Sequence, residues 1–267
     1  MLYSMSFLFF SGVVVMTSFV IEIAGAAFEV QPMFVSTREY CKRYLTDKEP
    51  VFRISVTEDD LNFEQEQLEK EAIDQHIRPR KFSGPFLERA TILRKTAVFL
   101  LKSGILLLHG STVAMDGSAY LFTAPCGTGK STHTKLWRQV FGDRVVMIND
   151  DKAFLKIEKD GVIACGSPWS GKHGLDTNIQ LPLRGICVLS RSKVNLIERA
   201  DPTGFLELLR EQILGYTDTT DLVEAHVALG RLINLVPVWH LTCNMDPDAA
   251  EVSYRAMSSC NYQKIRL

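Results

Sequence analysis

The chain has 267 residues, 46% of them hydrophobic, which is enough to bury the core of one large domain or of a domain with a smaller lobe. Its 30 Lys and Arg residues balance 31 Asp and Glu residues, and the net charge of -1 excludes a general basic surface for nucleic acid or an anionic membrane. The six cysteines are scattered without a CxxC pair, which argues against a zinc site or a disulfide framework and favours a reducing cytoplasm.

The first 21 residues carry no charge and form an apolar run that a membrane span or a signal peptide could also show. No Lys or Arg precedes Arg38, so the positive segment of a secretory signal is missing. The run is rich in β-branched residues and is interrupted by Ser, Thr and Gly. We therefore expect paired buried strands with a turn near Gly12, and the alternative is a membrane helix.

The next elements predict an N-terminal lobe of strands and a helix over residues 1–84, followed by a second domain over 85–267. Residues 51–60 begin as an alternating strand, and the acidic segment 58–72 suits a solvated turn and helix. The loop 76–85 contains two prolines and a glycine and is the predicted boundary. From Phe86 onwards apolar residues return at helical spacing, and Gly104 is expected to end that helix.

The middle of the chain predicts an α/β core. Residues 105–124 read as three short strands, with turns at 109–111 and 116–118. A glycine-rich loop follows, then a helix over 130–141 and a buried strand over 144–151 that ends in two carboxylates. Beyond it we expect a hairpin around 160–161, two strands within 183–200, helices over 203–215 and 219–234, a strand over 236–243 and a last helix from 246.

The stretch TAPCGTGKST, Thr123 to Thr132, has the Gly-Lys-Ser ending of a phosphate-binding loop, although Ala124 replaces the usual first glycine. In such a loop, backbone N–H groups and the N-terminal end of the next helix face phosphate oxygens. Lys130 is expected to reach the β and γ phosphates of ATP, and Ser131 to bind Mg²⁺. The alternative is a glycine-rich turn that happens to precede a helix. The residues predicted to bind the nucleotide are Pro125, Cys126, Gly127, Thr128, Gly129, Lys130, Ser131 and Thr132. Cys126 is expected to present its backbone rather than its thiol.

Asp150 and Asp151 end the strand after the loop, where a parallel sheet would bring them to the same edge as the loop. One carboxylate can hold Mg²⁺ and the other can accept a proton from an attacking hydroxyl, which is what phosphoryl transfer requires. The alternative is a solvated Asp-Asp turn, with Asn149 only capping it.

The segment GSPWSGKHGLDTN, residues 166–178, reads as a loop that carries hydrogen-bond donors. Lys172 is predicted to neutralise charge on the transferred phosphoryl group and is therefore added to the nucleotide-binding residues. Trp169 could stack on a base or anchor a surface loop. The remaining polar residues with a stated expectation are His133, His226 and His240, interpreted as packing residues, and Arg184 and Arg191, interpreted as surface charges with phosphate contacts as the alternative.

The order of His109-Gly110, the glycine loop with Lys130-Ser131, and Asp150-Asp151 resembles the catalytic domain of HPr kinase/phosphorylase. That family is similar in fold to phosphoenolpyruvate carboxykinase, so the resemblance implies a P-loop core with a mixed sheet, plus the smaller N-terminal α+β lobe. It also implies that Asp150 or Asp151 acts as the base for a serine hydroxyl, with His109 nearby. Thr132 and His133 follow the serine, where HPr kinases generally have an acidic residue, and the later glycine- and arginine-rich signature of that family is missing. The chain is thus closer to HPr-kinase-related proteins, and HPr itself is not the expected substrate.

These observations predict an ATP-dependent kinase with Mg²⁺, whose catalytic residues are His109, Lys130, Asp150 and Asp151 and whose metal ligands are Ser131, Asp150 and Asp151. The acceptor is expected to be a Ser or Thr hydroxyl of a small protein, a peptide or a metabolite. The alternative is a nucleotide-binding regulatory protein of the same fold that does not turn ATP over. A third hypothesis is a carboxykinase-like enzyme, for which the chain is short. Neither nucleic acid nor membrane is an expected partner, and self-association is compatible with the resemblance.

Overall fold

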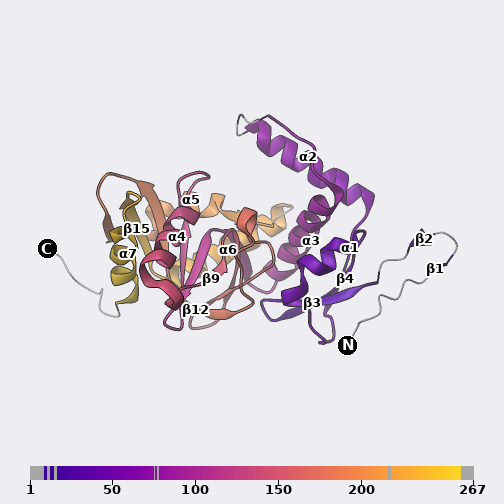
Figure 1. The fold of residues 1–267 in the computed structure, drawn as a ribbon, viewed down its shortest axis with the longest axis horizontal. Helices are drawn as coiled ribbons and strands as arrows, with labels where there is room; N and C mark the ends of the chain where they lie inside the picture. The colour runs from indigo at the N-terminus through magenta and orange to yellow at the C-terminus, as the bar shows by residue number, and fades with distance from the viewer. Residues whose placement is uncertain are drawn as a thin grey trace. The chain divides into compact units, whose positions relative to one another are not determined.

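A computed structural model describes residues 9–10, 13–14, 17–74, 76, 78–215 and 218–259 of the chain. Tertiary contacts divide the chain into two units, Met1–Thr96 and Ala97–Leu267, shown in indigo to purple and in magenta to yellow in Figure 1. The division lies within helix α3 (Gly84–Leu101), whose first residue is at the boundary predicted from the sequence.

Most of the N-terminal apolar run, including the predicted turn at Gly12, lies outside the described residues. Within the run, Phe9–Phe10 (β1) pairs with Val13–Val14 (β2) in antiparallel fashion. Among the residues that the structure describes, no helix is both long and apolar enough to cross a membrane.

The first unit contains a three-stranded sheet and helices. Strands β3 (Phe19–Ile23) and β4 (Ala26–Gln31) are antiparallel, and β5 (Phe52–Ser55) joins β4 in parallel. The helices are α1 (Val35–Tyr40), the 3₁₀ turn η1 (Lys42–Tyr44), α2 (Glu58–Asp74) and α3. Alternate residues of the strands, including Ile21, Ile23, Phe28, Val30 and Ile54, are buried and form the core of this unit.

The second unit is built on a ten-stranded mixed sheet, which confirms the predicted α/β class with a mixed sheet. Its strands follow the order β14-β6-β10-β11-β12-β8-β7-β9, while β15 pairs with the second half of β12 and β13 pairs with β15. The bounds are β6 (Ile105–His109), β7 (Ser111–Met115), β8 (Ser118–Thr123), β9 (Val146–Asn149), β10 (Lys152–Ile157), β11 (Val162–Cys165), β12 (Gln180–Arg191), β13 (Leu196–Arg199), β14 (Ile213–Leu214) and β15 (Val238–Cys243).

Helices cover both faces of this sheet, because its central strands are apolar on both sides. Along β8, Ala119 and Leu121 belong to one core cluster, whereas Tyr120 and Phe122 belong to the other. Helix α6 (Thr219–Leu235) packs into the first cluster, and helices α4 (Lys130–Phe141) and α7 (Asp248–Ser258) pack into the second (Figure 1). The result is a three-layer unit whose strands β8, β12 and β15 are parallel.

The predicted long helix over 203–215 is wrong. The structure has a 3₁₀ turn η4 (Pro202–Phe205), a short helix α5 (Leu206–Glu211) and then strand β14, which pairs with β6. Ile213 is buried opposite Leu108, so pairing with the edge of the sheet overrides the helical pattern of the segment. The other predicted elements of this unit are present, with ends that differ by a few residues.

Candidate functional site

The glycine-rich loop connects the carboxyl end of β8 to the first residue of α4, as the sequence predicts. The loop turns where Gly127 and Gly129 have φ of 75° and 127°, which side chains other than glycine rarely adopt. A Cβ atom at Gly127 would meet nothing within 4 Å, so the space beside this residue is open. An open turn that leads into a helix N-terminus suits an anion such as phosphate.

Lys130 lies in the first turn of α4 with its side chain folded across this loop. Its Nζ donates to the carbonyl O of Ala124 at 2.8 Å and lies 3.4 Å from that of Pro125. The residue is only 9% exposed, and burial lowers the pKa of its ammonium group, an effect that the negative charges of Asp151 and Asp150 oppose. The lysine is therefore placed to meet an anion in the loop, and Ser131 and Thr132 after it are exposed.

Asp150 follows strand β9 and is tied to helix α4 by two hydroxyl groups. The Oγ of Ser111 donates to Oδ1 of Asp150 at 2.6 Å and lies 2.9 Å from Oγ1 of Thr134. Thr134 is one helical turn after Lys130, so the hydroxyls connect the carboxylate with the helix that follows the loop. Asp150 is 7% exposed, which makes it the less accessible of the two carboxylates.

Asp151 is half-buried and faces His109, at the end of strand β6. Nδ1 of His109 lies 2.9 Å from Oδ1 of Asp151, at an angle that falls short of a hydrogen bond, and Nζ of Lys152 lies 3.5 Å from Oδ2. Burial acts to raise the pKa of Asp151, but His109 and the positive charge of Lys152 outweigh it and hold the pKa below its usual value. The carboxylate is thus kept ionised at neutral pH.

A glycine follows His109 at the end of β6 because position 110 has little space for a side chain. A Cβ atom there would lie 3.0 Å from the carbonyl O of Phe122 and 3.1 Å from Cδ2 of Leu121. Its N–H donates to the carbonyl O of Asp151 at 3.1 Å. The close approach to β8 fixes His109 beside the carboxylates and near the beginning of the glycine-rich loop.

The loop of residues 166–178 is anchored beside Asp151. Trp169 is 5% exposed and its ring meets that of Phe154 edge-on, with centroids 6.3 Å apart, so it anchors the loop and is not free to stack on a base. Gly171, with φ of 70°, brings the backbone so close that a Cβ atom would lie 3.1 Å from Cβ of Asp151. Lys172 and His173 follow in an exposed 3₁₀ turn, η3 (Gly171–His173).

Arg191, interpreted as a surface charge from the sequence, contacts the glycine-rich loop. Its Nη2 donates to the carbonyl O of Gly127 at 2.5 Å, and its Nε donates to that of Thr128 at 3.3 Å. A groove of about 590 Å³ lies beside these residues, and its further wall contains Phe205 and Leu208. This volume is within the usual range for a small-molecule site.

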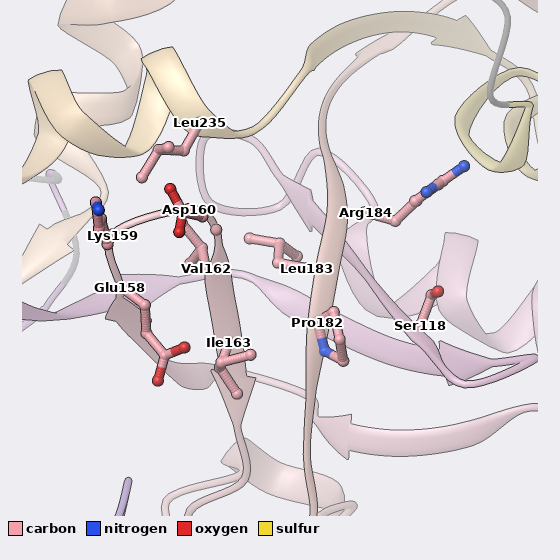
Figure 2. Close-up of a pocket in the computed structure, with 11 residues that line it drawn as sticks. Ser118, Glu158, Lys159, Asp160, Val162, Ile163, Pro182, Leu183, Arg184 and Leu235 are labelled. Carbon is pink, nitrogen blue, oxygen red and sulfur yellow. The ribbon is translucent and has the colours of Figure 1, made fainter.

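A second pocket of about 460 Å³ lies at the opposite end of β8, where Ser118 begins that strand. Figure 2 shows its mixed lining of charged side chains, such as Lys159, Asp160 and Arg184, with apolar residues such as Leu183. The guanidinium of Arg184 donates to the carbonyl O of Ser258 at 3.2 Å. Arg184 is therefore far from the glycine-rich loop in the sheet and is not placed to contact a phosphate bound there.

The three other histidines with a sequence interpretation differ from one another. His133 is 2% exposed, packs edge-on against Phe122 and lies 3.0 Å from Oγ of Ser253, which confirms a packing role. His240 is half-buried on β15, with Nε2 2.9 Å from Oγ of Ser190. His226 is exposed on α6, so its interpretation as a packing residue is wrong.

The structure thus brings His109, Asp150, Asp151 and the loop around Lys130 to one edge of the sheet, with Lys172 in the neighbouring loop. Sequence reasoning missed Ser111 and Thr134. It preferred a surface charge to a phosphate contact for Arg191, and it assigned Asn149 only a turn-capping role. Because Ser111 lies 39 residues before Asp150, only the pairing of β7 with β8 and β9 brings them together. The HGS sequence at 109–111 is the signal that could have indicated Ser111, since it directly precedes an apolar strand.

The donor set restricts the kind of metal site that this edge could provide. In the described part of the chain, no group of three or more His, Cys, Asp and Glu side chains is arranged to hold a metal ion. Mg²⁺ does not require such a group, because it usually binds one or two carboxylates together with substrate phosphates and water. Asp150, Asp151 and the Ser131 hydroxyl fit that requirement.

Comparison with known proteins adds a distant structural likeness. No protein-family model matches the chain, and no curated protein matches it. Among solved structures, the Hpr(Ser) kinase/phosphatase from Coxiella burnetii is similar at a TM-score of 0.33 and 11% sequence identity, over 57% of this chain and 99% of that chain. A structural similarity at this TM-score is too low to assign a fold or an activity to this chain. The relationship to HPr kinases therefore stays a prediction, and the function proposed below rests on the geometry of the site.

Proposed function

We propose that the chain is an ATP-dependent phosphotransferase that moves the γ-phosphoryl group of ATP to a hydroxyl of a Ser or Thr in a protein or peptide, or of a metabolite. The observation that carries this proposal is the convergence, on one sheet edge, of an open glycine turn at a helix N-terminus with the carboxylates of Asp150 and Asp151. The hydroxyls of Ser111 and Thr134 connect the two parts directly. Phosphoryl transfer requires this combination of anion binding and proton acceptance.

The glycine-rich loop would bind the triphosphate of ATP. Its backbone N–H groups and the N-terminus of α4 supply partial positive charge, and Lys130 supplies a full one. The groove beside Arg191 and Phe205 has room for the nucleoside, and it adjoins the outer side of the same loop. Binding there would orient the γ-phosphate toward the carboxylates, whose charges already act on Lys130.

The two carboxylates would have different tasks. Asp150 and Ser131 would hold Mg²⁺, which when bound neutralises charge on the phosphate oxygens. Asp150 suits this task because it is nearly buried and is held by a hydroxyl connected to α4, the helix that carries Ser131.

Asp151 would act as the proton acceptor, because it is the more accessible carboxylate and is held ionised beside His109 and Lys152. In the reaction, the acceptor hydroxyl gives its proton to Asp151 as its oxygen bonds to the γ-phosphorus. The bond between that phosphorus and the oxygen bridging to the β-phosphate breaks, and ADP leaves with the electron pair. Lys130 would stabilise the charge that develops on the phosphoryl oxygens.

The test combines calorimetric binding of Mg-ATP with transfer of labelled phosphate to a library of Ser- and Thr-containing peptides and small proteins. The Lys130→Ala variant should bind ATP about 10- to 100-fold more weakly, because a charged hydrogen-bond donor to phosphate is lost. The Asp151→Asn variant should bind ATP normally and transfer phosphate about 100- to 10,000-fold more slowly, because the proton acceptor is lost. Lys159→Ala is the matched control, since Lys159 is an exposed lysine at the opposite end of the sheet.

Unchanged ATP affinity in the Lys130→Ala variant would contradict the loop assignment. Full transfer by Asp151→Asn would contradict the role of Asp151 as base. If the wild-type protein binds Mg-ATP tightly but transfers phosphate to no acceptor and does not hydrolyse it, the chain is a nucleotide-binding regulatory protein of the kind given above as the alternative.

A further inference from the structure

Asn149 ends strand β9 immediately before the two carboxylates, and its amide is fully engaged. The side chain is 0% exposed. Its Oδ1 accepts from the backbone N–H of Asp151 at 2.8 Å and from that of Lys152 at 2.5 Å. Its Nδ2 donates to both the carbonyl O and the Oγ of Ser167, at 2.9 Å and 3.0 Å. One end of the amide therefore shapes the turn at Asp151, and the other end holds the loop of residues 166–178.

The first residues of that loop are held further by Ser167. Its own Oγ donates to the carbonyl O of Lys152 at 2.8 Å, so Ser167 contacts both Asn149 and the strand that follows the carboxylates. Ser167 is 0% exposed, and Trp169 is buried just after it. Loss of the Asn149 amide would remove the side-chain acceptor of the Asp151 and Lys152 N–H groups and the side-chain donor to the carbonyl O of Ser167.

The other end of the loop returns to the same strand. Asn149 forms an isolated bridge with Asp176, and the N–H of Thr177 donates to the carbonyl O of Ile148 at 3.2 Å. Inside the loop, Oγ of Ser170 donates to Oδ1 of Asp176 at 2.7 Å, and both residues are buried. Both ends of the loop are thus fixed to β9, and its apex at Gly171 is in contact with Asp151.

We propose that Asn149 is a positioning residue that holds the Asp151 carboxylate and the 166–178 loop in one geometry, so that this loop is a fixed wall of the site and not a closing lid. The catalytic part of this inference rests on the proposed function, whereas the coupling of the two segments does not. It follows that Asn149 also supports the turn that carries Lys172, because Lys172 comes directly after Gly171 in this loop.

The coupling is tested by backbone hydrogen exchange in the full chain without nucleotide. In Asn149→Ala, the segments 150–153 and 167–173 should both exchange about tenfold or more faster than in wild type, because the shared amide has been lost. Ser167→Ala removes only a hydroxyl and should accelerate the same two segments to a smaller extent. Asn195→Ala is the matched control, because both ends of that amide are also bonded. Its Oδ1 accepts from the N–H of Asn244, and its Nδ2 donates to the side chains of Asn244 and Asp248, away from the candidate site.

The positioning role is tested by steady-state kinetics with the peptide acceptor identified by the library. For Asn149→Ala we expect kcat to fall about 100-fold, since misplacement of a reacting group by about 1 Å has effects of this size, while KM for ATP stays within about twofold. A parallel rise in KM for ATP would indicate general damage to the fold and overturn the role.

The two hypotheses fail in different ways. Unchanged exchange in both segments of Asn149→Ala and Ser167→Ala overturns the coupling, whatever the wild type does with ATP. Faster exchange in both segments with wild-type kcat overturns the positioning role. A wild-type protein that does not bind Mg-ATP overturns the proposed function, and the exchange experiment still decides whether Asn149 couples the loop to the carboxylate turn.

Discussion

Cysteine exposure distinguishes the glycine-rich loop from the rest of the protein. Among the described cysteines, Cys126 is exposed, Cys243 is half-buried, and Cys41, Cys165 and Cys187 are buried. Burial raises the pKa of Cys41 and of Cys165 to about 12, and it raises those of Cys187 and Cys243 above their usual value. Because the thiolate is the reactive form, these four side chains should react slowly at neutral pH.

We therefore expect a maleimide reagent at pH 7.5 to modify Cys126 first, in a Cys260→Ser background because Cys260 lies outside the described residues. Mg-ATP bound in the loop should slow this reaction about tenfold or more by covering the thiol. The labelled site is identified by mass spectrometry of the digest. In Cys126→Ser the fast reaction should disappear while ATP binding persists, since the backbone and not the thiol would face the phosphate. Reaction of Cys126 at the same rate with saturating Mg-ATP would speak against nucleotide binding in this loop.

The principal side chains of the candidate site could be predicted from the sequence, but their partners could not. Lys130 and the two carboxylates stand in recognisable local patterns, which fix their residue types and their order along the chain. Ser111 and Ser167 lie 39 and 18 residues from the side chains that they hold. A local sequence such as HGS at 109–111 can draw attention to a serine, but its partner is identified only once the register of the strands is known.

At the scale of elements, a charge cluster joins helices α2 and α3 in the first unit. Arg94 of α3 forms ion pairs with Glu64 and, at 3.5 Å, with Asp60 of α2, and Lys95 pairs with Asp60 at 2.8 Å. The guanidinium also lies over the ring of Phe63, 4.7 Å from its centroid. Burial raises the pKa of Glu64, although the hydrogen bond and charge of Arg94 act in the opposite direction.

Arg94→Met should destabilise the first unit by about 2 to 3 kcal/mol at pH 7, because Glu64 would remain buried without its partner. With the pKa of Glu64 raised in the folded state, its protonated form is favoured by folding. The penalty should therefore be largest at pH 7 and shrink as the pH falls toward 4.5, where folding takes up a proton. Urea unfolding followed by far-UV circular dichroism measures both effects.

Two further variants, one at Glu64 and one at Lys81, serve as controls for this prediction. Glu64→Gln combined with Arg94→Met should recover much of the lost stability, because the uncompensated charge is removed. Lys81→Met breaks the ion pair between Lys81 and Glu69, and it should have little effect on stability because the Lys81 side chain is 83% exposed. Equal destabilisation by Lys81→Met and Arg94→Met would show that the burial of Glu64 has no special energetic effect.

The helices and strands that could be predicted from the sequence have regularly spaced apolar residues, or glycine and turn residues at their ends. Helix α4 begins after Gly129 and ends before Gly142, and the turns at 116–117 and 160–161 connect strands that pair in antiparallel fashion. The segment 203–215 failed because its apolar residues serve two purposes, a helix of six residues and an edge strand on β6. The spacing of apolar residues describes one segment at a time. It cannot show that the end of a segment with helical spacing pairs with a strand elsewhere in the chain.

At the scale of the whole molecule, the two units have separate cores and can be observed separately. The first unit is built around residues such as Phe28 and Ile54, and the second around the two clusters on either side of its sheet. All three tryptophans, Trp137, Trp169 and Trp239, belong to the second unit and are buried there. Tryptophan fluorescence therefore reports on the second unit alone, whereas far-UV circular dichroism reports on both.

The candidate site lies entirely in the second unit, so a ligand bound there should stabilise that unit specifically. Mg-ATP at 100 times its Kd contributes about 2.7 kcal/mol to the folded state, which should raise the midpoint of the tryptophan-monitored thermal transition by roughly 5 to 10 °C. The part of the circular dichroism transition that Arg94→Met shifts should not move with Mg-ATP, and Lys130→Ala should abolish most of the shift in fluorescence. If fluorescence and circular dichroism give one coincident transition that both Arg94→Met and Mg-ATP move, the chain unfolds as a single cooperative body, because independent cores would respond to only one of the two changes.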